Sequence, residues 1–301
     1  MHAAQGKVLI SGSSGLIGAA LVRQLASQGW QVTRLTRTNA SGANQVSWDP
    51  SKPMLPESVS GFDAVIHLAG ESIAERWTKA RKQAIRDSRV GGTRNISEAL
   101  ARSAKRPALL LAASAIGFYG DRGDEVLVEQ SSAGRGFLAE VCRDWEIATQ
   151  AAAKAGIRTV QARFGVVLAR SGGALAKMLT PFRLGVGGNL GSGGQWWSWV
   201  ALDDVIGAIE HILKADTLEG PVNVVSPNPV TNREFTKSLA SALSRPAVFP
   251  MPAFAARMAL GSMADELLLA SQRVDPAKLR SSGYRFQYTD LRPALEAILG
   301  N

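Results

Sequence analysis

The stretch Lys7-Val-Leu-Ile-Ser-Gly-Ser-Ser-Gly-Leu-Ile-Gly18 decides the fold of this 301-residue chain. A short apolar run leads into three glycines, and a helical pattern over 19–28 follows at once. The first glycine permits a tight turn, the second lets backbone N–H groups approach a phosphate, and the third lets the helix pack on its own strand. The helix N-terminus adds unpaired donors and partial positive charge. The pattern therefore predicts a dinucleotide site whose pyrophosphate lies along Gly12, Ser13, Ser14, Gly15, Leu16, Ile17 and Gly18.

The end of a second predicted strand, 31–36, indicates which dinucleotide binds. NAD-selective sites usually carry Asp or Glu there, whereas this strand runs into Arg37 and the first acidic residue of the chain is Asp49. Arg37, with Arg34 as a second candidate, is placed to meet a 2′-phosphate, and such a charge-assisted hydrogen bond contributes about 1.5–3 kcal/mol. A solvated arginine at a strand end is the alternative. We predict NADP(H) rather than NAD(H).

The composition is that of an ordinary globular protein, with 46% hydrophobic and 20% charged residues. The net charge of +9 comes mostly from residues 75–106, which hold ten Lys or Arg against three acids. No aromatic stacking pattern accompanies this run, so a solvated helix face is expected rather than nucleic-acid binding. One cysteine and three histidines argue against a disulfide and against a metal site.

No membrane association is expected from the sequence. The first residues show no cleavable signal pattern, and the longest uncharged run, 184–202, contains six glycines. Together with the single cysteine, these features predict a cytoplasmic protein. A small-molecule substrate is expected in the pocket beyond the carboxyl ends of the strands. The sequence says nothing about the oligomeric state.

Apolar runs alternate with helical patterns through the first two-thirds of the chain, which predicts a doubly wound α/β fold with a parallel sheet. Further strands are expected at 46–48, 64–68, 108–113, 158–163, 196–200 and 221–225, and helices at 78–103 and 137–155. Another helix is expected to start at Asp203, with Asp203 and Asp204 as capping residues. We assign residues 1–170 and 195–226 to a dinucleotide-binding Rossmann domain, and 171–194 and 227–301 to a smaller substrate lobe.

The chain resembles the extended short-chain dehydrogenase/reductase superfamily, and within it the atypical epimerase-family branch that has its own C-terminal domain. The segments that carry the resemblance are Ser11–Gly18, His67–Glu71, Arg86–Arg89, Ser114–Gly120, Leu179–Gly185, Asn223–Glu234 and Asp265–Val274. The resemblance implies a Rossmann domain that binds NADP(H) and a C-terminal substrate lobe. It also implies that Leu68 and Ala69 line the adenine or ribose, and that Arg89 stands beside the cofactor where relatives usually carry Asn.

The usual catalytic pair of this superfamily is absent from the sequence. Superfamily members pair a Tyr with a Lys four residues later, which lowers the pKa of the tyrosine for proton exchange. No Tyr-x-x-x-Lys occurs in this chain, and in the segment where it is expected Phe137 and Val141 offer no proton. Tyr119 is a candidate for a displaced phenol, although packing at the sheet edge is favoured.

Two other residues are candidates for the chemistry. Ser114 follows its strand, where a substrate oxygen can be hydrogen-bonded, with a turn-capping role as the alternative. Glu71 follows the strand 64–68 and is predicted to point toward the nicotinamide, with pairing to the basic run as the alternative. Cys142 is expected to be buried and inert, and His67 is expected to lie in the core or beside the cofactor rather than to act as a base. The tryptophans at 196, 197 and 199 are expected either to cover a flat substrate or to pack in the core.

Two functions therefore remain open from the sequence. The favoured one is an NADP(H)-dependent oxidoreductase or epimerase-like protein, in which Ser114 positions the substrate and Glu71 acts as acid or base. The alternative is a non-catalytic NADP(H)-binding sensor or interaction module. The missing Tyr and Lys favour the sensor, whereas Ser114 and the pocket-forming tail favour the enzyme.

Overall fold

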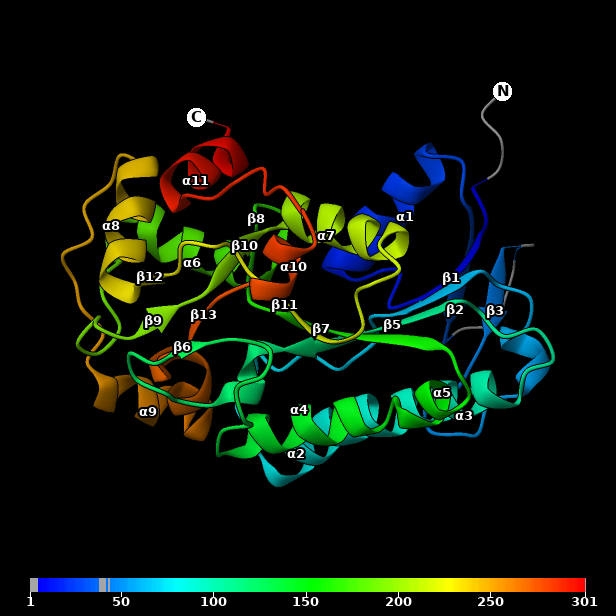
Figure 1. The fold of residues 1–301 in the computed structure, drawn as a ribbon. Helices are drawn as coiled ribbons and strands as arrows, with labels where there is room; N and C mark the ends of the chain where they lie inside the picture. Colours follow the sequence, from blue (N-terminus) through cyan, green and yellow to red (C-terminus); the bar gives the residue numbers. More distant parts are fainter. Residues whose placement is uncertain (1–4, 38–41, 43, 301) are drawn as a thin grey trace.

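A seven-stranded parallel sheet forms the centre of the molecule (Figure 1). The structure is a computed structural model that describes residues 5–37, 42 and 44–300. The strands of the sheet are β1 (Lys7–Ser11), β2 (Gln31–Thr36), β3 (Gln45–Ser47), β4 (Ala64–His67), β5 (Leu109–Ala115), β7 (Arg158–Phe164) and β11 (Gly220–Val224). They stand in the order β3-β2-β1-β4-β5-β7-β11. The chain order reverses at β1, which confirms the predicted doubly wound fold.

Helices cover both faces of this sheet, as a buried parallel sheet requires (Figure 1). One face carries α1 (Leu16–Ser27) and α7 (Leu202–Lys214), and the other carries α2 (Lys79–Arg86), α3 (Gly92–Arg102), α4 (Phe137–Ile147) and α5 (Gln150–Lys154). Successive residues of β1 feed the two cores: Val8 and Ile10 join one cluster, while Leu9 joins Ile96 and Leu100 of α3 in the other.

Neither of the two long predicted helices is a single regular α-helix. A π-helical segment, η2 (Asp87–Gly91), connects α2 to α3 without a break in the helical path. The predicted helix at 137–155 is divided by Ala148 and Thr149 into α4 and α5. π turns concentrate at functional sites, because the extra residue redirects nearby side chains. The segment η2 carries Ser88 and Arg89.

A second core lies beside the sheet, in the part of the chain after β7. The elements after β7 that have not yet been named are β8 (Val166–Ala169), α6 (Gly173–Arg183), β9 (Trp196–Trp197), β10 (Trp199–Ala201), β12 (Val230–Thr231), α8 (Asn232–Ala242), α9 (Ala253–Leu260), η4 (Ala264–Leu269, a π-helical segment), β13 (Arg273–Val274), α10 (Ala277–Ser281) and α11 (Leu291–Leu299). Residues of β8, α6, β9, β10, α8 and α11 form the second core. Short elements before it are η1 (Pro56–Val59), η3 (Ile116–Tyr119) and β6 (Val126–Leu127). Trp197 and Trp199 pack in this core with Phe235 and Leu295. Two of the three clustered tryptophans are therefore structural.

Two local predictions around residue 200 were wrong. The expected strand at 196–200 divides, since β9 pairs with β12 and β10 pairs with β8. The helix α7 begins at Leu202 with Ala201 as its N-cap and no side-chain cap, so the aspartates at its start do not cap it. Asp204 instead accepts hydrogen bonds from the backbone N–H groups of Gln287 (2.7 Å) and Tyr288 (3.0 Å). Its carboxylate fastens the C-terminal segment to the sheet domain.

Among the described residues, no helix is both long enough and apolar enough to cross a membrane.

Candidate functional site

The glycine turn after β1 has the geometry of a phosphate cradle. Gly12 has a φ of +68°, and a Cβ there would lie 2.7 Å from the carbonyl carbon of Leu68. A Cβ on Gly18 would lie 2.1 Å from the Gly12 carbonyl oxygen, so strand and helix approach too closely for any side chain. The helix α1 begins at Leu16 with no side-chain cap and no acidic residue in its first turn. Its free N–H groups fit a pyrophosphate.

Ser11 holds the next loop in place beside this turn. Its hydroxyl accepts hydrogen bonds from the N–H groups of Leu68 (3.2 Å) and Ala69 (3.3 Å) and lies 2.6 Å from His67 Nδ1. Burial lowers the pKa of His67 to about 4, and the ring lies edge-on to Trp48. The predicted burial of His67 is confirmed. Ser11 was missed because a serine inside a glycine motif gives no sign of its long-range partners.

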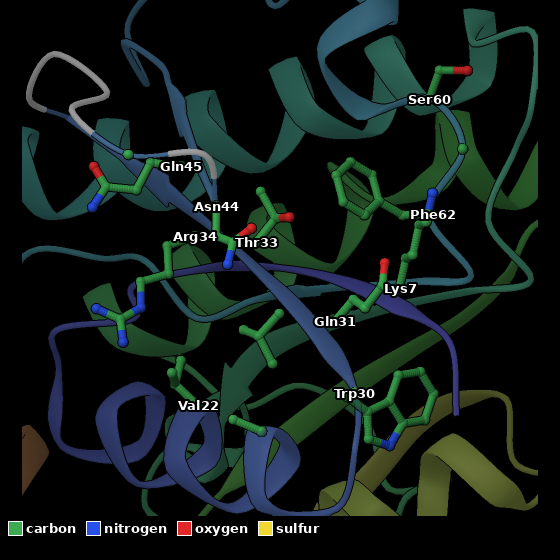
Figure 2. Close-up of a pocket in the computed structure, with 14 residues that line it drawn as sticks. Lys7, Val22, Trp30, Gln31, Thr33, Arg34, Asn44, Gln45, Ser60 and Phe62 are labelled. Carbon is green, nitrogen blue, oxygen red and sulfur yellow. The ribbon is translucent and has the colours of Figure 1, made fainter. Parts of the chain in front are cut away.

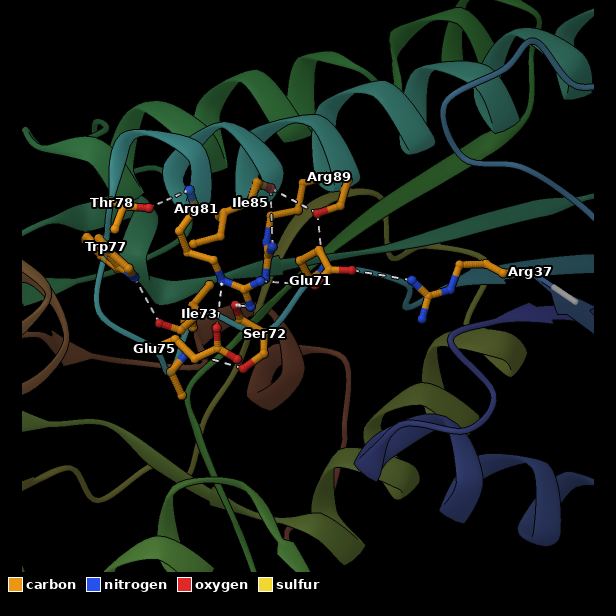
Figure 3. A network of polar contacts seen from close by, with 12 residues as sticks. Arg37, Glu71, Ser72, Ile73, Glu75, Trp77, Thr78, Arg81, Ile85 and Arg89 are labelled. Carbon is orange, nitrogen blue, oxygen red and sulfur yellow. Dashed lines mark hydrogen bonds and ion pairs between the residues drawn. The ribbon is translucent and has the colours of Figure 1, made fainter.

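Figure 3 shows Glu71 between two arginines at the edge of this turn. Its Oε1 lies 3.4 Å from Arg37 and its Oε2 lies 3.4 Å from Arg81. Arg81 also pairs with Glu75 at 3.5 Å and donates to the carbonyl of Ser72. The structure therefore brings together Arg37, predicted at the adenosine end, and Glu71, predicted at the nicotinamide end.

Arg89 lies on the sheet side of the π-helical segment η2. Its guanidinium is 3.4 Å from an ideal Cβ on Gly70, lies over the Trp145 ring at 5.1 Å, and donates to the Ile85 carbonyl at 3.3 Å. Burial lowers the pKa of Arg89. The neighbouring Ser88 hydroxyl accepts the N–H of Glu71 at 3.1 Å. The π turn thus carries two residues that contact the loop after β4.

Ser114 lies at the other end of the site, near the end of β5, and has a partner that the sequence did not reveal. Its hydroxyl donates to Glu146 Oε1 of α4 at 2.7 Å, and the residue is only 2% exposed. Arg163 of β7 donates two hydrogen bonds to the same carboxylate, from Nε to Oε1 at 2.7 Å and from Nη2 to Oε2 at 2.8 Å. Arg163 also donates to the Tyr119 hydroxyl at 2.9 Å, which donates in turn to Asn223 at 2.7 Å. No hydrogen bond joins Ser114 to Glu71 in the described part of the chain.

The side of α4 that faces Ser114 carries apolar residues in place of a proton donor. Cys142 and Leu138 stand one and two turns before Glu146, respectively, and both lie against Gly117. Burial raises the pKa of Cys142 to about 12, which removes it as a nucleophile near neutral pH. Phe137 packs on Trp77 with ring centroids 5.2 Å apart. Leu138 and Cys142, rather than Phe137 and Val141, therefore form the face of α4 that lies against Gly117.

A cavity of about 230 Å³ opens beside this face. Its lining comes from two stretches far apart in the chain, 117–138 and 257–270: Gly117, Gly120, Asp121, Arg135, Leu138, Arg257, Asp265, Glu266, Leu269 and Ala270. Glu266 of η4 accepts the N–H groups of Phe137 (3.2 Å) and Leu138 (2.7 Å), so it caps α4 across the two parts. The cavity therefore lies beyond the carboxyl end of β5, where substrates bind in doubly wound folds.

A larger hollow of about 870 Å³ lies at the opposite end of the sheet (Figure 2). Its walls include Lys7 and Gln31, which begin β1 and β2, together with Trp30 and Phe62. Dinucleotides bind at the carboxyl ends of parallel strands, beyond Ser11, not at their starts. Size alone therefore does not make this hollow the cofactor site.

Comparison with known proteins decides the family. The profile described as the NAD dependent epimerase/dehydratase family matches residues 8–225, and a domain of unknown function, DUF1731, matches residues 251–298. The chain belongs to the NAD-dependent epimerase/dehydratase family. This confirms the resemblance to extended short-chain dehydrogenases/reductases and makes a nicotinamide dinucleotide the class of cofactor.

Full-length relatives support this membership. The chain is 43% identical over 290 residues to epimerase family protein Mb2239 of Mycobacterium bovis, covering 96% of each chain. It is 37% identical to the chloroplastic SDR39U1 homolog of Arabidopsis thaliana, covering 97% of this chain and 86% of that one. The crystal structure of human epimerase family protein SDR39U1 with NADPH superposes with a TM-score of 0.90 at 31% identity, over 98% of this chain and 99% of that one.

Proposed function

We propose that this protein is an NADP(H)-dependent oxidoreductase or epimerase-like enzyme that acts on a small-molecule substrate. Arg37 carries the choice of cofactor: it follows β2 directly, its side chain is 74% exposed, and no acidic residue precedes Asp49 in the chain. A guanidinium at this strand end suits a 2′-phosphate, whereas an NAD-selective site has a carboxylate there. The NADPH bound to human SDR39U1, at 31% identity, supports the same choice.

The cofactor, when bound, supplies or accepts the hydride. In the proposal Gly12, Gly15 and Gly18 hold its pyrophosphate, Leu68 and Ala69 line its adenosine, and the 230 Å³ cavity receives the substrate. Ser114 gives its hydroxyl hydrogen to Glu146, which leaves the oxygen lone pairs to accept a hydrogen bond from a substrate hydroxyl. The acid/base role predicted for Glu71 places it at the nicotinamide, whereas its carboxylate lies 3.4 Å from Arg37, the proposed 2′-phosphate ligand at the other end of the cofactor. The two roles exclude each other, and the turnover of Glu71→Gln decides the first.

One observation favours the sensor instead. Ser114 is 2% exposed and committed to Glu146, and the facing residues Leu138 and Cys142 cannot exchange a proton near neutral pH. In that alternative, cofactor binding at the sheet edge changes the C-terminal lobe through the Glu266 cap on α4. It requires tight NADPH binding without turnover of any substrate.

An assay of substrate turnover distinguishes the enzyme from the non-catalytic sensor. Purified protein is first screened for carried-over ligand, and NADPH oxidation is then followed against a library of carbonyl compounds. For a carbonyl that is reduced, the reverse reaction is then followed with the corresponding alcohol and NADP+. There Ser114→Ala is expected to bind the cofactor normally and to lose about tenfold in turnover, because the substrate hydroxyl loses the oxygen that accepts its hydrogen bond. Glu71→Gln is assayed in the same way. Ser103→Ala is the control, because Ser103 is also buried but donates only to the Leu100 carbonyl. Tight NADPH binding with no turnover of any compound would favour the sensor.

A further inference from the structure

The carboxylate of Glu71 occupies a position that suits a ligand anion. It bridges two guanidinium groups, each 3.4 Å away, and is itself 36% exposed (Figure 3). Arg37 directly follows β2 and Arg81 lies in α2, so the carboxylate of Glu71, in the loop after β4, bridges two separate elements. A bound anion placed there would meet the same two cations.

The two ion pairs of Glu71 differ in strength. Arg81 is 19% exposed and is fixed by Glu75 at 3.5 Å and by the Ser72 carbonyl. Arg37 is 74% exposed, and within the described residues Glu71 is its one ion-pair partner. Exposed pairs of long side chains are weak, since solvent and salt screen them. The ion pair between Glu71 and Arg37 is therefore the weaker of the two, and it is the one that a bound anion would break.

A phosphate monoester is a stronger partner for Arg37 than a carboxylate. It carries about −1.5 to −2 charges at pH 7 and three acceptor oxygens, which suit the fork of a guanidinium. When phosphate takes Arg37, the carboxylate of Glu71 is left beside a like charge. The ion pair between Glu71 and Arg81 remains.

We propose that Glu71 is a specificity-determining residue for the cofactor. In the cofactor-free protein it neutralises Arg37, and it competes with the 2′-phosphate of NADP(H) for that guanidinium. It weakens the binding of NADPH more than that of NADH, which has a ribose 2′-hydroxyl at this point. The inference rests on the proposed role of Arg37 as the 2′-phosphate ligand.

Calorimetric titration with NADPH, NADH and adenosine 2′,5′-bisphosphate tests this inference. Glu71→Gln is expected to tighten NADPH and the bisphosphate by about three- to fivefold and to change NADH by less than about twofold. The gain should shrink at high salt. Glu75→Gln is the matched control, because it removes the same charge from Arg81 without a contact to Arg37, and it should leave all three affinities unchanged.

The same titrations in an Arg37→Ala background separate the outcomes. There most of the Glu71→Gln gain is expected to be lost, because Glu71 and the 2′-phosphate no longer compete for the Arg37 guanidinium. The part that remains comes from the like charge of Glu71 beside the phosphate and should vanish at high salt. If the wild type prefers NADPH through Arg37 but Glu71→Gln leaves NADPH affinity unchanged or weaker, this inference fails and the proposed cofactor stands. If Arg37→Ala leaves NADPH affinity unchanged, both fail.

Discussion

Ser114 donates its hydroxyl hydrogen to Glu146, 2.7 Å away, and Arg163 holds the same carboxylate through two further contacts. The arrangement links the ends of β5 and β7 to α4, the helix whose Leu138 lines the 230 Å³ cavity. On the same helix, Leu138 and Cys142 lie against Gly117, and neither exchanges a proton near neutral pH. The Glu146 carboxylate is therefore held from two strands of the sheet.

Glu146→Gln is expected to destabilise the protein strongly. Arg163 is 3% and Glu146 13% exposed, so the variant leaves a buried guanidinium without its countercharge. Loss of one partner of a buried pair costs about 3–5 kcal/mol. Urea unfolding measures the free energy of unfolding. Glu140→Gln is the control, since its pair with Arg86 is half exposed and should contribute less than about 1 kcal/mol. Equal losses in both variants would contradict the account.

Gly18→Ala is expected to disrupt the cofactor turn. The new Cβ would lie 2.1 Å from the Gly12 carbonyl oxygen, which is backbone and cannot rotate away. We expect a loss of about 3 kcal/mol in unfolding free energy and loss of NADPH binding. Gly91→Ala serves as control, because no atom lies within 4 Å of its Cβ position. It should be neutral or stabilising by up to about 1 kcal/mol. Normal NADPH affinity in Gly18→Ala would refute the proposed cradle.

His67 should make the protein sensitive to mild acid. Its folded-state pKa of about 4 lies below the unfolded value near 6.5, so the unfolded chain binds the proton more readily. Stability is full above pH 6.5, declines as the pH falls toward 4, and loses about 3 kcal/mol in total. NMR titration of the ring measures the pKa directly. A His67 ring that titrates near pH 6.5 in the folded protein would disprove this.

The sequence predicted what local patterns determine. The glycine turn, the strands of the sheet and the helices on both faces follow from residue spacing within about twenty positions. The hydrogen-bond partners of Ser114 and Asp204 could not be predicted in this way. Glu146 lies 32 residues from Ser114 along the chain, and Gln287 lies 83 residues from Asp204. Helical periodicity also could not tell whether 137 and 141 or 138 and 142 face the site. That choice depends on how α4 packs on β5 and η3.

The π turn at η2 illustrates the same limit. Residues 78–103 have an uninterrupted helical pattern, and nothing in their spacing shows where one residue is accommodated as a bulge. The bulge places Ser88 against the Glu71 backbone and Arg89 beside Gly70. Contacts with the loop after β4, rather than helix propensity, account for its position.

Cofactor titration of the wild type and of Arg37→Ala tests the central claim most directly. The wild type is expected to bind NADPH at least about tenfold more tightly than NADH, because the Arg37 guanidinium contributes a charge-assisted hydrogen bond to the 2′-phosphate. Arg37→Ala should weaken NADPH toward the NADH value and leave NADH unchanged. Equal affinities of the wild type for the two cofactors would contradict the assignment of this site to NADP(H).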